Sequence, residues 1–395
     1  MSRTLTNPPA CIAAGADGRV LLLSMRRVAD LVGYVPLYEF EDVITNLLGA
    51  DIGYVLDVDA MEPARKLLKV AGLLTRSRRV ADYVKRVSPS LPLERAYDLF
   101  LAVFNHPHEL FALNSLRDWR KRSRLAVCYL CEAWDGRLPQ YLIDLLRDFD
   151  HVFVGVNSSV EMVARMCGRP CSYLPMAVDA LAFCPYPARA QRFIDICGIG
   201  RRSPITHTSL IDYAKETGLF YYYDTIQTRG TPRSAANITF RVNDPHEHRM
   251  LLANLLKRSR YFIANRAWAD QPALTKGKDE IAARFYEGSA AGTVMLGEPP
   301  DSDDFRRQFD WKDSVVRVPF HAPNIAEIIA ELDADRARVA RIRRDAVVNS
   351  LLRHDWVHRL REIMAVTGIA PTERLLAREA RLRVLADEVG KAVAS

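Results

Sequence analysis

Short apolar runs alternate with helical segments along most of the chain, and this alternation restricts the fold more than any other feature. Apolar strands separated by helices are typical of βαβ units, in which the strands form a parallel sheet. The first half therefore predicts an α/β fold with a doubly wound, Rossmann-like sheet. Its strands are expected at Arg19–Ser24, Ile52–Val58, Asp98–Phe104, Arg124–Glu132 and His151–Val156, with a helix at Phe40–Leu48.

The same alternation starts again after Leu174–Ala190, a segment with little periodicity that carries Pro175, Pro185 and Pro187. Proline-rich segments of this kind separate domains. We therefore expect two Rossmann-like domains at 1–185 and 186–368, followed by a helical tail at 369–395. The second set of strands is expected at Arg192–Gly200, Leu219–Thr225, Arg260–Arg266, Gly292–Glu298 and Ser314–Pro319, and the helices at Glu280–Ala291, Ile325–Leu352, Trp356–Val366 and Pro371–Ala394.

Ligands of doubly wound sheets bind beyond the carboxyl ends of the strands, so two such domains predict a ligand cleft between them. The 55 Lys and Arg residues exceed the 48 Asp and Glu residues by 7, which suits a phosphate-bearing ligand. Aromatic and basic residues do not interleave on a recognisable module, so we expect no nucleic-acid partner. The basic stretch Lys66–Arg86 is a candidate for peripheral membrane contact, and a solvated helix face is the alternative.

The seven cysteines are odd in number and show no disulfide-framework spacing. Cys128 and Cys131 form a C-x-x-C, but they lie in an apolar run that is typical of a buried strand. The first residues contain no apolar core of a signal peptide, and no apolar run approaches the length of a membrane span. These features predict a cytoplasmic protein with reduced cysteines.

A glycine turn follows the strand at Arg192–Gly200 and carries two arginines, Arg201 and Arg202. Glycine lets backbone N–H groups approach a phosphate, a following helix N-terminus favours an anion, and arginine adds a charge-assisted contact. A tight turn with a solvated arginine pair is the alternative.

A second acidic segment contains Asp279, Glu280 and Glu287, followed by the small residues Gly288–Gly292. Glu280 and Glu287 are seven residues apart and are expected near one helical face. A carboxylate there can accept hydrogen bonds from sugar hydroxyls. The alternative is an amphipathic helix with ordinary surface acids.

Three segments together resemble the retaining glycosyltransferases of the GT-B fold. Leu174–Pro185 resembles the segment that leads into their second domain, the Gly198–Arg202 turn resembles their glycine–arginine turn, and Arg284–Glu298 resembles their acidic donor motif. The resemblance covers roughly 150–368, and the carboxyl-terminal half of the chain is similar to the spore-maturation-protein-like, or CgeB-like, branch. It implies an N-terminal acceptor-binding domain and a C-terminal domain that binds a nucleotide sugar.

The resemblance also implies donor-binding roles, carried over by position. Glu287 matches the acid that holds the donor ribose hydroxyls, and Asp279 stands where the usual pair has a first glutamate. Arg201 matches the turn arginine, while His207 stands near the place of a lysine. Lys276 or Lys278 is preferred to His207 for neutralising the diphosphate, because a permanent cation does not titrate near neutral pH. The expected donor site comprises Gly200, Arg201, Arg202, His207, Lys276, Lys278, Asp279, Glu287, Gly288 and Ser289.

Two strand ends of the first half carry polar residues that would face the cleft. His106 follows one strand, and Glu132 and Trp134 follow another. His106 is a candidate for contact with donor or acceptor, Trp134 for stacking on a sugar, and Glu132 for a base if the reaction inverts. Local loop capping and hydrophobic anchoring are the alternatives. His106, Glu132 and Glu287 are thus the candidate catalytic residues.

Two acid clusters resemble metal motifs, namely Asp57 with Asp59 and the run Asp301–Asp304. In a two-domain chain of this kind, basic residues and helix ends neutralise phosphates, so we expect structural roles for both clusters and no metal.

The function expected from these features is hexosyl transfer from a nucleoside diphosphate sugar, with retention, no metal and no further cofactor, within glycoconjugate or polysaccharide biosynthesis. Two alternatives stay open: a sugar-nucleotide epimerase of the same fold, and a non-catalytic nucleotide-sugar sensor or scaffold. The sugar, the base, the acceptor and the oligomeric state are left open by the sequence.

Overall fold

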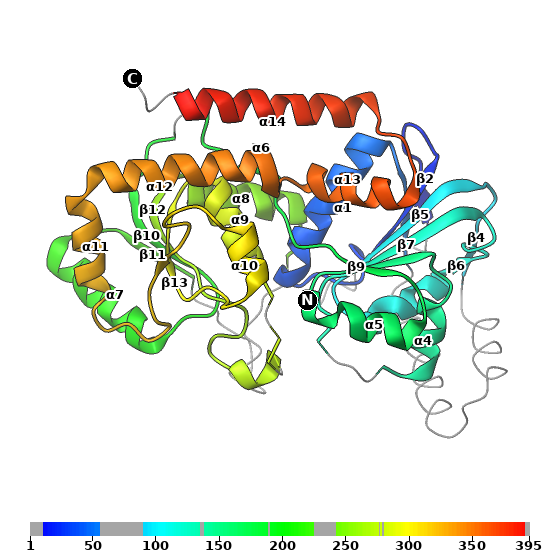
Figure 1. The fold of residues 1–395 in the computed structure, drawn as a ribbon, viewed down its shortest axis with the longest axis horizontal. Coiled ribbons are helices and arrows are strands. Elements are labelled where there is room, and N and C mark those ends of the chain that lie inside the picture. The colour runs from blue at the N-terminus through cyan, green and yellow to red at the C-terminus, as the bar shows by residue number, and fades with distance from the viewer. Residues whose placement is uncertain are drawn as a thin grey trace, which may run out of the picture. The chain divides into compact units, whose positions relative to one another are not determined.

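The computed structural model describes residues 11–55, 90–134, 138–188, 190–224, 242–275, 277–278 and 280–391. By its internal contacts the chain forms two compact units (Figure 1). Unit 1 comprises Met1–Asp30, Phe40–Pro175 and Glu362–Arg374, and unit 2 comprises Leu31–Glu39, Met176–Arg361 and Leu375–Ser395. The expected division at 185 and 368 stays a prediction, and the basic stretch Lys66–Arg86 lies outside the described residues.

Unit 1 contains a seven-stranded sheet in which six strands are parallel and only the edge strand β1 is antiparallel to its neighbour. The strands expected from the sequence are present, and the apolar residues of the central ones are buried on both faces. In order across the sheet, the strands are β1 (Cys11–Ala13), β3 (Asp51–Tyr54), β2 (Val20–Ser24), β5 (Tyr97–Phe104), β7 (Ser123–Leu130), β8 (His151–Val154) and β9 (Cys171–Tyr173).

The first parallel strand, β2, lies between β3 and β5, so the chain winds one way from β2 to β3 and the other way from β5 onward. Because crossovers between parallel strands are right-handed, this order covers both faces of the sheet with helices. In the described part of the first half, the helical elements are η1 (Val32–Tyr34), α1 (Val35–Leu48), η2 (Pro107–Ser115), α4 (Gln140–Leu146), η3 (Asn157–Ser159) and α5 (Val160–Cys167), and β4 (Leu91–Pro92) pairs with β6 (Leu116–Arg117).

Unit 2 contains a five-stranded sheet that is parallel throughout. Its first strand, β10, again lies between the second and the third, so the winding direction changes between β10 and β12. Both sheets therefore confirm the expected doubly wound α/β class. In order across the sheet, the strands are β11 (Tyr221–Tyr223), β10 (Ile194–Gly198), β12 (Ser259–Ile263), β13 (Val294–Gly297) and β14 (Val316–Arg317).

The helices of unit 2 differ from expectation at several places. The helix expected over Ile325–Leu352 is interrupted at Asp335, whose carboxylate accepts a hydrogen bond from Arg338 N and thereby caps a new helix. The non-periodic Leu174–Ala190 contains a short helix capped in the same way by Asp179. The described helical elements of unit 2 are α6 (Ala180–Phe183), α7 (Pro204–Thr217), α8 (Pro245–Lys257), η4 (Pro272–Thr275), α9 (Ala283–Ala290), α10 (Asp303–Gln308), α11 (Ile325–Ala334), α12 (Arg336–Asn349), η5 (Ser350–His354), the first half of α13 (Trp356–Thr367) and most of α14 (Glu373–Lys391).

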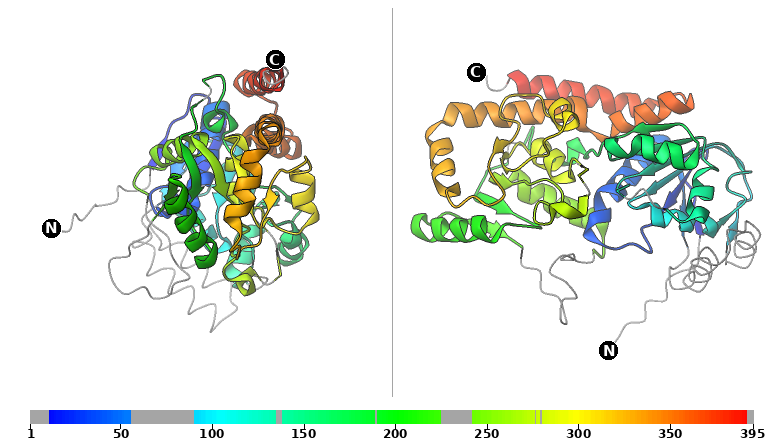
Figure 2. Two further views of the ribbon diagram at one scale, coloured as in Figure 1. Left: turned by 90° about the vertical axis from the view of Figure 1, so that its left-hand side faces the viewer. Right: turned by 60° about the horizontal axis from the view of Figure 1, so that its bottom comes forward.

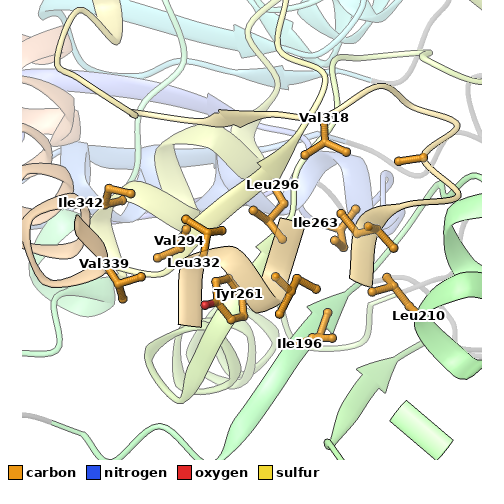
Figure 3. Close-up of a cluster of buried hydrophobic side chains, with 13 residues drawn as sticks. Ile196, Leu210, Tyr261, Ile263, Val294, Leu296, Val318, Leu332, Val339 and Ile342 are labelled. Atoms are coloured by element: carbon orange, nitrogen blue, oxygen red, sulfur yellow. The ribbon is translucent and has the colours of Figure 1, made fainter. Parts of the chain in front are cut away.

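The core of unit 2 joins one face of its sheet to the helices that follow the last strand (Figure 3). Side chains of β10, β12 and β13 meet those of α11 and α12, and the shared residues include Ile196, Ile263, Val294, Leu296, Leu332, Val339 and Ile342. This packing holds the strand ends that carry the candidate site. Among the helices of the described segments, none combines the length and apolarity needed to cross a membrane.

Candidate functional site at the switch point of unit 2

A pocket lies at the carboxyl ends of β10 and β12, where the winding direction of the unit 2 sheet changes. Its open space is about 310 Å³, part of it continuous with solvent. Open α/β sheets bind ligands at this kind of switch point. The lining residues are Gly198, Ile199, Arg201, Arg202, Ser203, Thr206, His207, Leu210, Tyr221, Ile263, Asn265 and Phe320.

The expected glycine turn forms one wall of the pocket. Gly200 has a φ of +76°, which L side chains rarely adopt, and α7 begins directly afterward with Ser203 as its N-cap. The Gly200 N–H donates to the Asp224 carboxylate, at 3.0 Å to Oδ1 and 3.1 Å to Oδ2. The sequence predicted that this N–H binds a phosphate, whereas in the structure it donates to the Asp224 carboxylate.

Both arginines of the turn are engaged by acids as well. Arg201 pairs with Asp270 at 3.2 Å, and its guanidinium carbon lies 3.9 Å from the centroid of the Trp268 ring. Arg202 donates to the backbone oxygen and the carboxylate of Asp224. Both arginines therefore line the pocket while paired with acids, and they do not form the solvated pair of the alternative interpretation.

His207 lies on α7 inside the pocket, where its Nδ1 is 3.0 Å from the Tyr221 hydroxyl. Its ring also packs edge-on against Tyr223, with 4.7 Å between centroids. Burial, aided by the charge of Arg202, lowers the pKa of His207. Both effects favour the neutral form of the ring, so His207 is not a permanent cation for a diphosphate.

Glu287 lies on α9 with only 7% of its side chain exposed. Its Oε1 accepts a hydrogen bond from Arg249 Nη1 of α8. The other oxygen, Oε2, accepts no hydrogen bond from a described residue. It is also not one of the side-chain atoms that are both fully buried and without a hydrogen-bond partner. One oxygen of this carboxylate is thus fixed, and the other is available to a ligand.

Arg284 is the residue of this site that the sequence analysis missed. It lies three residues before Glu287 on α9, and its Nη2 is 3.8 Å from the place a Cβ would occupy on Gly200. Burial lowers the pKa of Arg284, Glu287 opposes that change, and Arg201 reinforces it. In the described part of the chain, no carboxylate lies within ion-pair distance of its guanidinium. In the sequence, only its position one helical turn from Glu287 indicated that Arg284 belongs to this site.

The rest of the acidic segment is arranged differently from expectation. Helix α9 begins at Ala283, so Glu280 precedes the helix and does not share a helical face with Glu287. Asp279 and Lys276 lie outside the described residues. Lys278 follows η4, where its backbone N–H donates to Thr275 O.

Gly288 and Ser289 face the interior of unit 2. A Cβ on Gly288 would come 2.6 Å from Met295 Sδ, so the glycine permits close packing of α9 on the sheet. Ser289 is fully buried. Their expected role in donor binding stays a prediction.

In unit 1, the structure brings His106, Glu132 and Trp134 together beyond the ends of β5 and β7. Glu132 Oε2 lies 3.6 Å from His106 Nε2 and accepts a hydrogen bond of 3.2 Å from Trp134 Nε1. His106 is also the N-cap residue of η2, without a side-chain capping bond. The three residues form one partly exposed cluster, a contact that the sequence analysis did not predict, and their expected roles toward donor or acceptor stay predictions.

The Asp301–Asp304 run has a structural role at the start of α10. Ser302 caps that helix, Asp301 and Asp303 pair with Arg306, and Asp304 pairs with Arg307. Asp57 and Asp59 lie outside the described residues. Within the described ranges, no group of three or more His, Cys, Asp or Glu side chains could hold a metal ion.

The fold and the pocket place the chain in the class of α/β proteins with two doubly wound parallel sheets. A sequence comparison narrows this class: residues 241–365 match the family described as "Glycosyl transferase-like". That segment lies within unit 2 apart from its last residues and includes Arg249, Arg284 and Glu287. This part of the chain is therefore similar in sequence to that family. No curated protein matches the sequence.

Several solved structures are similar in fold. TarM matches with a TM-score of 0.39 and 12% identity over 69% of this chain. A Staphylococcus aureus TarM mutant bound to Fondaparinux, alpha-GlcNAc-glycerol and UDP gives 0.42 and 11% over 68%. The chain covers 55% of each TarM chain. The glycotransferase of kitacinnamycin gives 0.37 and 11%, over 89% of this chain and 99% of that one.

Proposed function

We propose that the protein is a glycosyltransferase that moves a sugar from a nucleoside diphosphate sugar to an acceptor hydroxyl. The carrying observation is the pair Arg284 and Glu287, one helical turn apart on α9, of which Arg284 reaches the Gly200 turn whose neighbours Ile199 and Arg201 line the switch-point pocket. The match of residues 241–365 to a glycosyltransferase-like family supports this assignment.

The two residues carry opposite charges, and each suits a different part of such a donor, namely the ribose hydroxyls or the diphosphate. Glu287 Oε2 would accept hydrogen bonds from ribose hydroxyls. Arg284, whose charge no described carboxylate neutralises at ion-pair distance, would bind the diphosphate. The N-terminus of α7, whose N-cap Ser203 lines the pocket, favours an anion as well.

Catalysis would then rest on stabilising the leaving diphosphate. The bond between the anomeric carbon and the phosphate oxygen breaks, and the negative charge that develops on that oxygen is stabilised by Arg284. The acceptor oxygen forms the new bond to the anomeric carbon, and its proton passes to the departing phosphate oxygen in a retaining reaction. Retention, independence of metal and the hexosyl class are carried by the motif resemblance and form part of the proposal, as does a cytoplasmic location.

The acceptor side is assigned to unit 1. His106, Glu132 and Trp134 combine an imidazole, a carboxylate and an indole in one partly exposed cluster. An aromatic face packs against sugar C–H groups, and the polar atoms can bind hydroxyls. Glu132 would be the base if the reaction inverts.

The test is release of nucleoside diphosphate from a panel of nucleotide sugars by purified protein, followed by ³¹P NMR. We expect wild-type protein to hydrolyse one donor slowly. Glu287→Ala should reduce the rate by about tenfold or more, because a hydrogen bond to a charged group is lost. Addition of EDTA should leave the rate unchanged.

Arg336→Met serves as the control, since this exposed arginine of α12 lies in unit 2 outside the pocket. Binding of a nucleotide sugar without turnover, with or without acceptors, would favour the non-catalytic scaffold. Recovery of an epimerised nucleotide sugar would favour the epimerase. An equal rate in Glu287→Ala would contradict the proposed site.

A further inference from the structure

Glu39, which belongs to unit 2 although it lies far away in the sequence, is a buried carboxylate with four hydrogen bonds. Its Oε1 accepts from Arg249 Nε at 2.9 Å. Its Oε2 accepts from Arg249 Nη2 at 3.1 Å, from Asp179 N at 2.8 Å and from Trp356 Nε1 at 2.9 Å. The carboxylate therefore has one well-defined orientation.

Arg249 connects this carboxylate to Glu287. Its side chain is 4% exposed, its Nε and Nη2 face Glu39, and its Nη1 donates to Glu287 Oε1. The ring of Phe183 lies 4.7 Å below the guanidinium carbon. Burial opposes the charge of Arg249, but Glu39 and Glu287 outweigh it and raise its pKa. Because the planar guanidinium is hydrogen-bonded to both carboxylates, the orientation of Glu39 fixes that of Glu287 Oε1.

This arrangement is costly as a purely structural device. Two carboxylates and one guanidinium are buried together, and apolar side chains of similar volume often stabilise a fold equally well. The three groups also leave Oε2 of Glu287 without a bond from a described residue, while every oxygen of Glu39 is satisfied. The network therefore ends on a single acceptor atom that is fixed in direction.

We propose that Glu39 is a positioning residue, which acts through Arg249 to aim Glu287 Oε2 at the ribose hydroxyls of the bound nucleotide. This inference rests on the proposed function, because it takes the donor site to be at Glu287. It adds that a residue near the start of the chain sets the preference of unit 2 for ribose over deoxyribose.

The test compares the dissociation constants of a ribonucleoside diphosphate and of its 2′,3′-dideoxy analogue by calorimetry. In the wild type, the analogue should bind roughly 10- to 100-fold more weakly, as expected for lost hydrogen bonds to a carboxylate. In Glu287→Ala, the ratio of the two constants should fall to about one. In Glu39→Gln, which keeps the shape but removes the charge, the ratio should fall by roughly tenfold.

The ratio separates positioning from a loss of fold, because a general weakening of the site would change both constants alike. Asp313→Asn is the matched control: Asp313 holds two arginines, Arg338 and Arg341, elsewhere in unit 2. It should keep the wild-type ratio. If Glu39→Gln does not fold, Trp356→Phe removes one donor to Glu39 and should reduce the ratio by a smaller factor.

The two proposals fail in different ways. If wild-type protein binds neither nucleotide, or if Glu287→Ala keeps the wild-type ratio, the donor site itself is wrong. If the ratio collapses in Glu287→Ala but is unchanged in folded Glu39→Gln and Trp356→Phe, the donor site stands and the positioning role of Glu39 is overturned.

Discussion

At the scale of single residues, Glu41 shows how burial and pairing compete. This carboxylate of unit 1 is 1% exposed, accepts a hydrogen bond of 2.7 Å from Ser24 Oγ, and pairs with Arg26 at 2.9 Å. Burial raises the pKa of Glu41 to about 7, and Arg26 offsets only part of that rise. A buried carboxylate in this condition takes up a proton more readily in the folded than in the unfolded chain.

The sign of the effect on stability follows from this difference. Because the folded pKa is the higher one, the stabilisation from Glu41 is fully present below the unfolded value and is lost as the pH rises through about 7. Glu41→Gln should therefore gain stability relative to the wild type between pH 5 and pH 8, by up to about 3 kcal/mol. Urea unfolding of both proteins at each of the two pH values measures this difference in the free energy of unfolding.

Glu161→Gln is the control for this prediction, since Glu161 is a surface residue of α5 with 88% of its side chain exposed. Its difference from the wild type should be the same at both pH values. A pH-independent difference for Glu41→Gln as well would contradict the raised pKa.

Residue roles were predictable where one local pattern determined them. The small and charged residues around Gly200 indicated the turn, and the apolar runs before them placed His106 and Glu132 just after strand ends. Arg284 resembled an ordinary surface arginine of a helix, because only the fold brings the Gly200 turn next to it. The Glu39–Arg249 contact joins residues 210 positions apart, so no local pattern contains it.

At the scale of elements, α14 shows why the end of the chain is part of unit 2. The helix lies beside α12 in each view (Figures 1 and 2). Its Arg378 donates to both oxygens of the fully buried Asp355, at 2.8 and 2.7 Å, and to Asp179 at 2.7 Å. Asp355 also accepts from the backbone of Ala180 and Val357. One arginine thus joins α14 to α6 and α13.

Arg378→Ala should destabilise unit 2 by about 3–5 kcal/mol, because it leaves the Asp355 charge buried without its cation. Thermal unfolding of the variant measures the loss. Arg381→Ala, an exposed position of the same helix, is the control and should remain within about 0.5 kcal/mol of the wild type. Equal stability of the two variants would show that α14 does not depend on this ion pair.

The limits of elements were less predictable than their existence. The apolar runs located the strands, since burial on both faces requires continuous apolar sequence. The start of α9 at Ala283 and the break at Asp335 depend on backbone conformation and capping, which apolar periodicity does not contain. The short α6 was hidden by the prolines around it.

At the scale of the whole molecule, both units wind their parallel sheets in the same way, and each carries polar residues at the carboxyl ends of its strands. The repetition of the strand–helix alternation predicted this architecture. The sequence could not show that Arg284 is the arginine of this site with no described carboxylate at ion-pair distance. Arg201 and Arg202 meet Asp270 and Asp224 only in the folded chain.

The most direct test of the central claim is calorimetric titration of the protein with nucleoside diphosphates of different bases. The account predicts that one of them binds the wild type and Arg336→Met equally. It predicts that Arg284→Met weakens this binding by roughly 10- to 100-fold, because a charged contact to the diphosphate is lost. Failure of every nucleoside diphosphate to bind folded wild-type protein, or equal binding by Arg284→Met, would contradict a nucleotide-sugar site in unit 2.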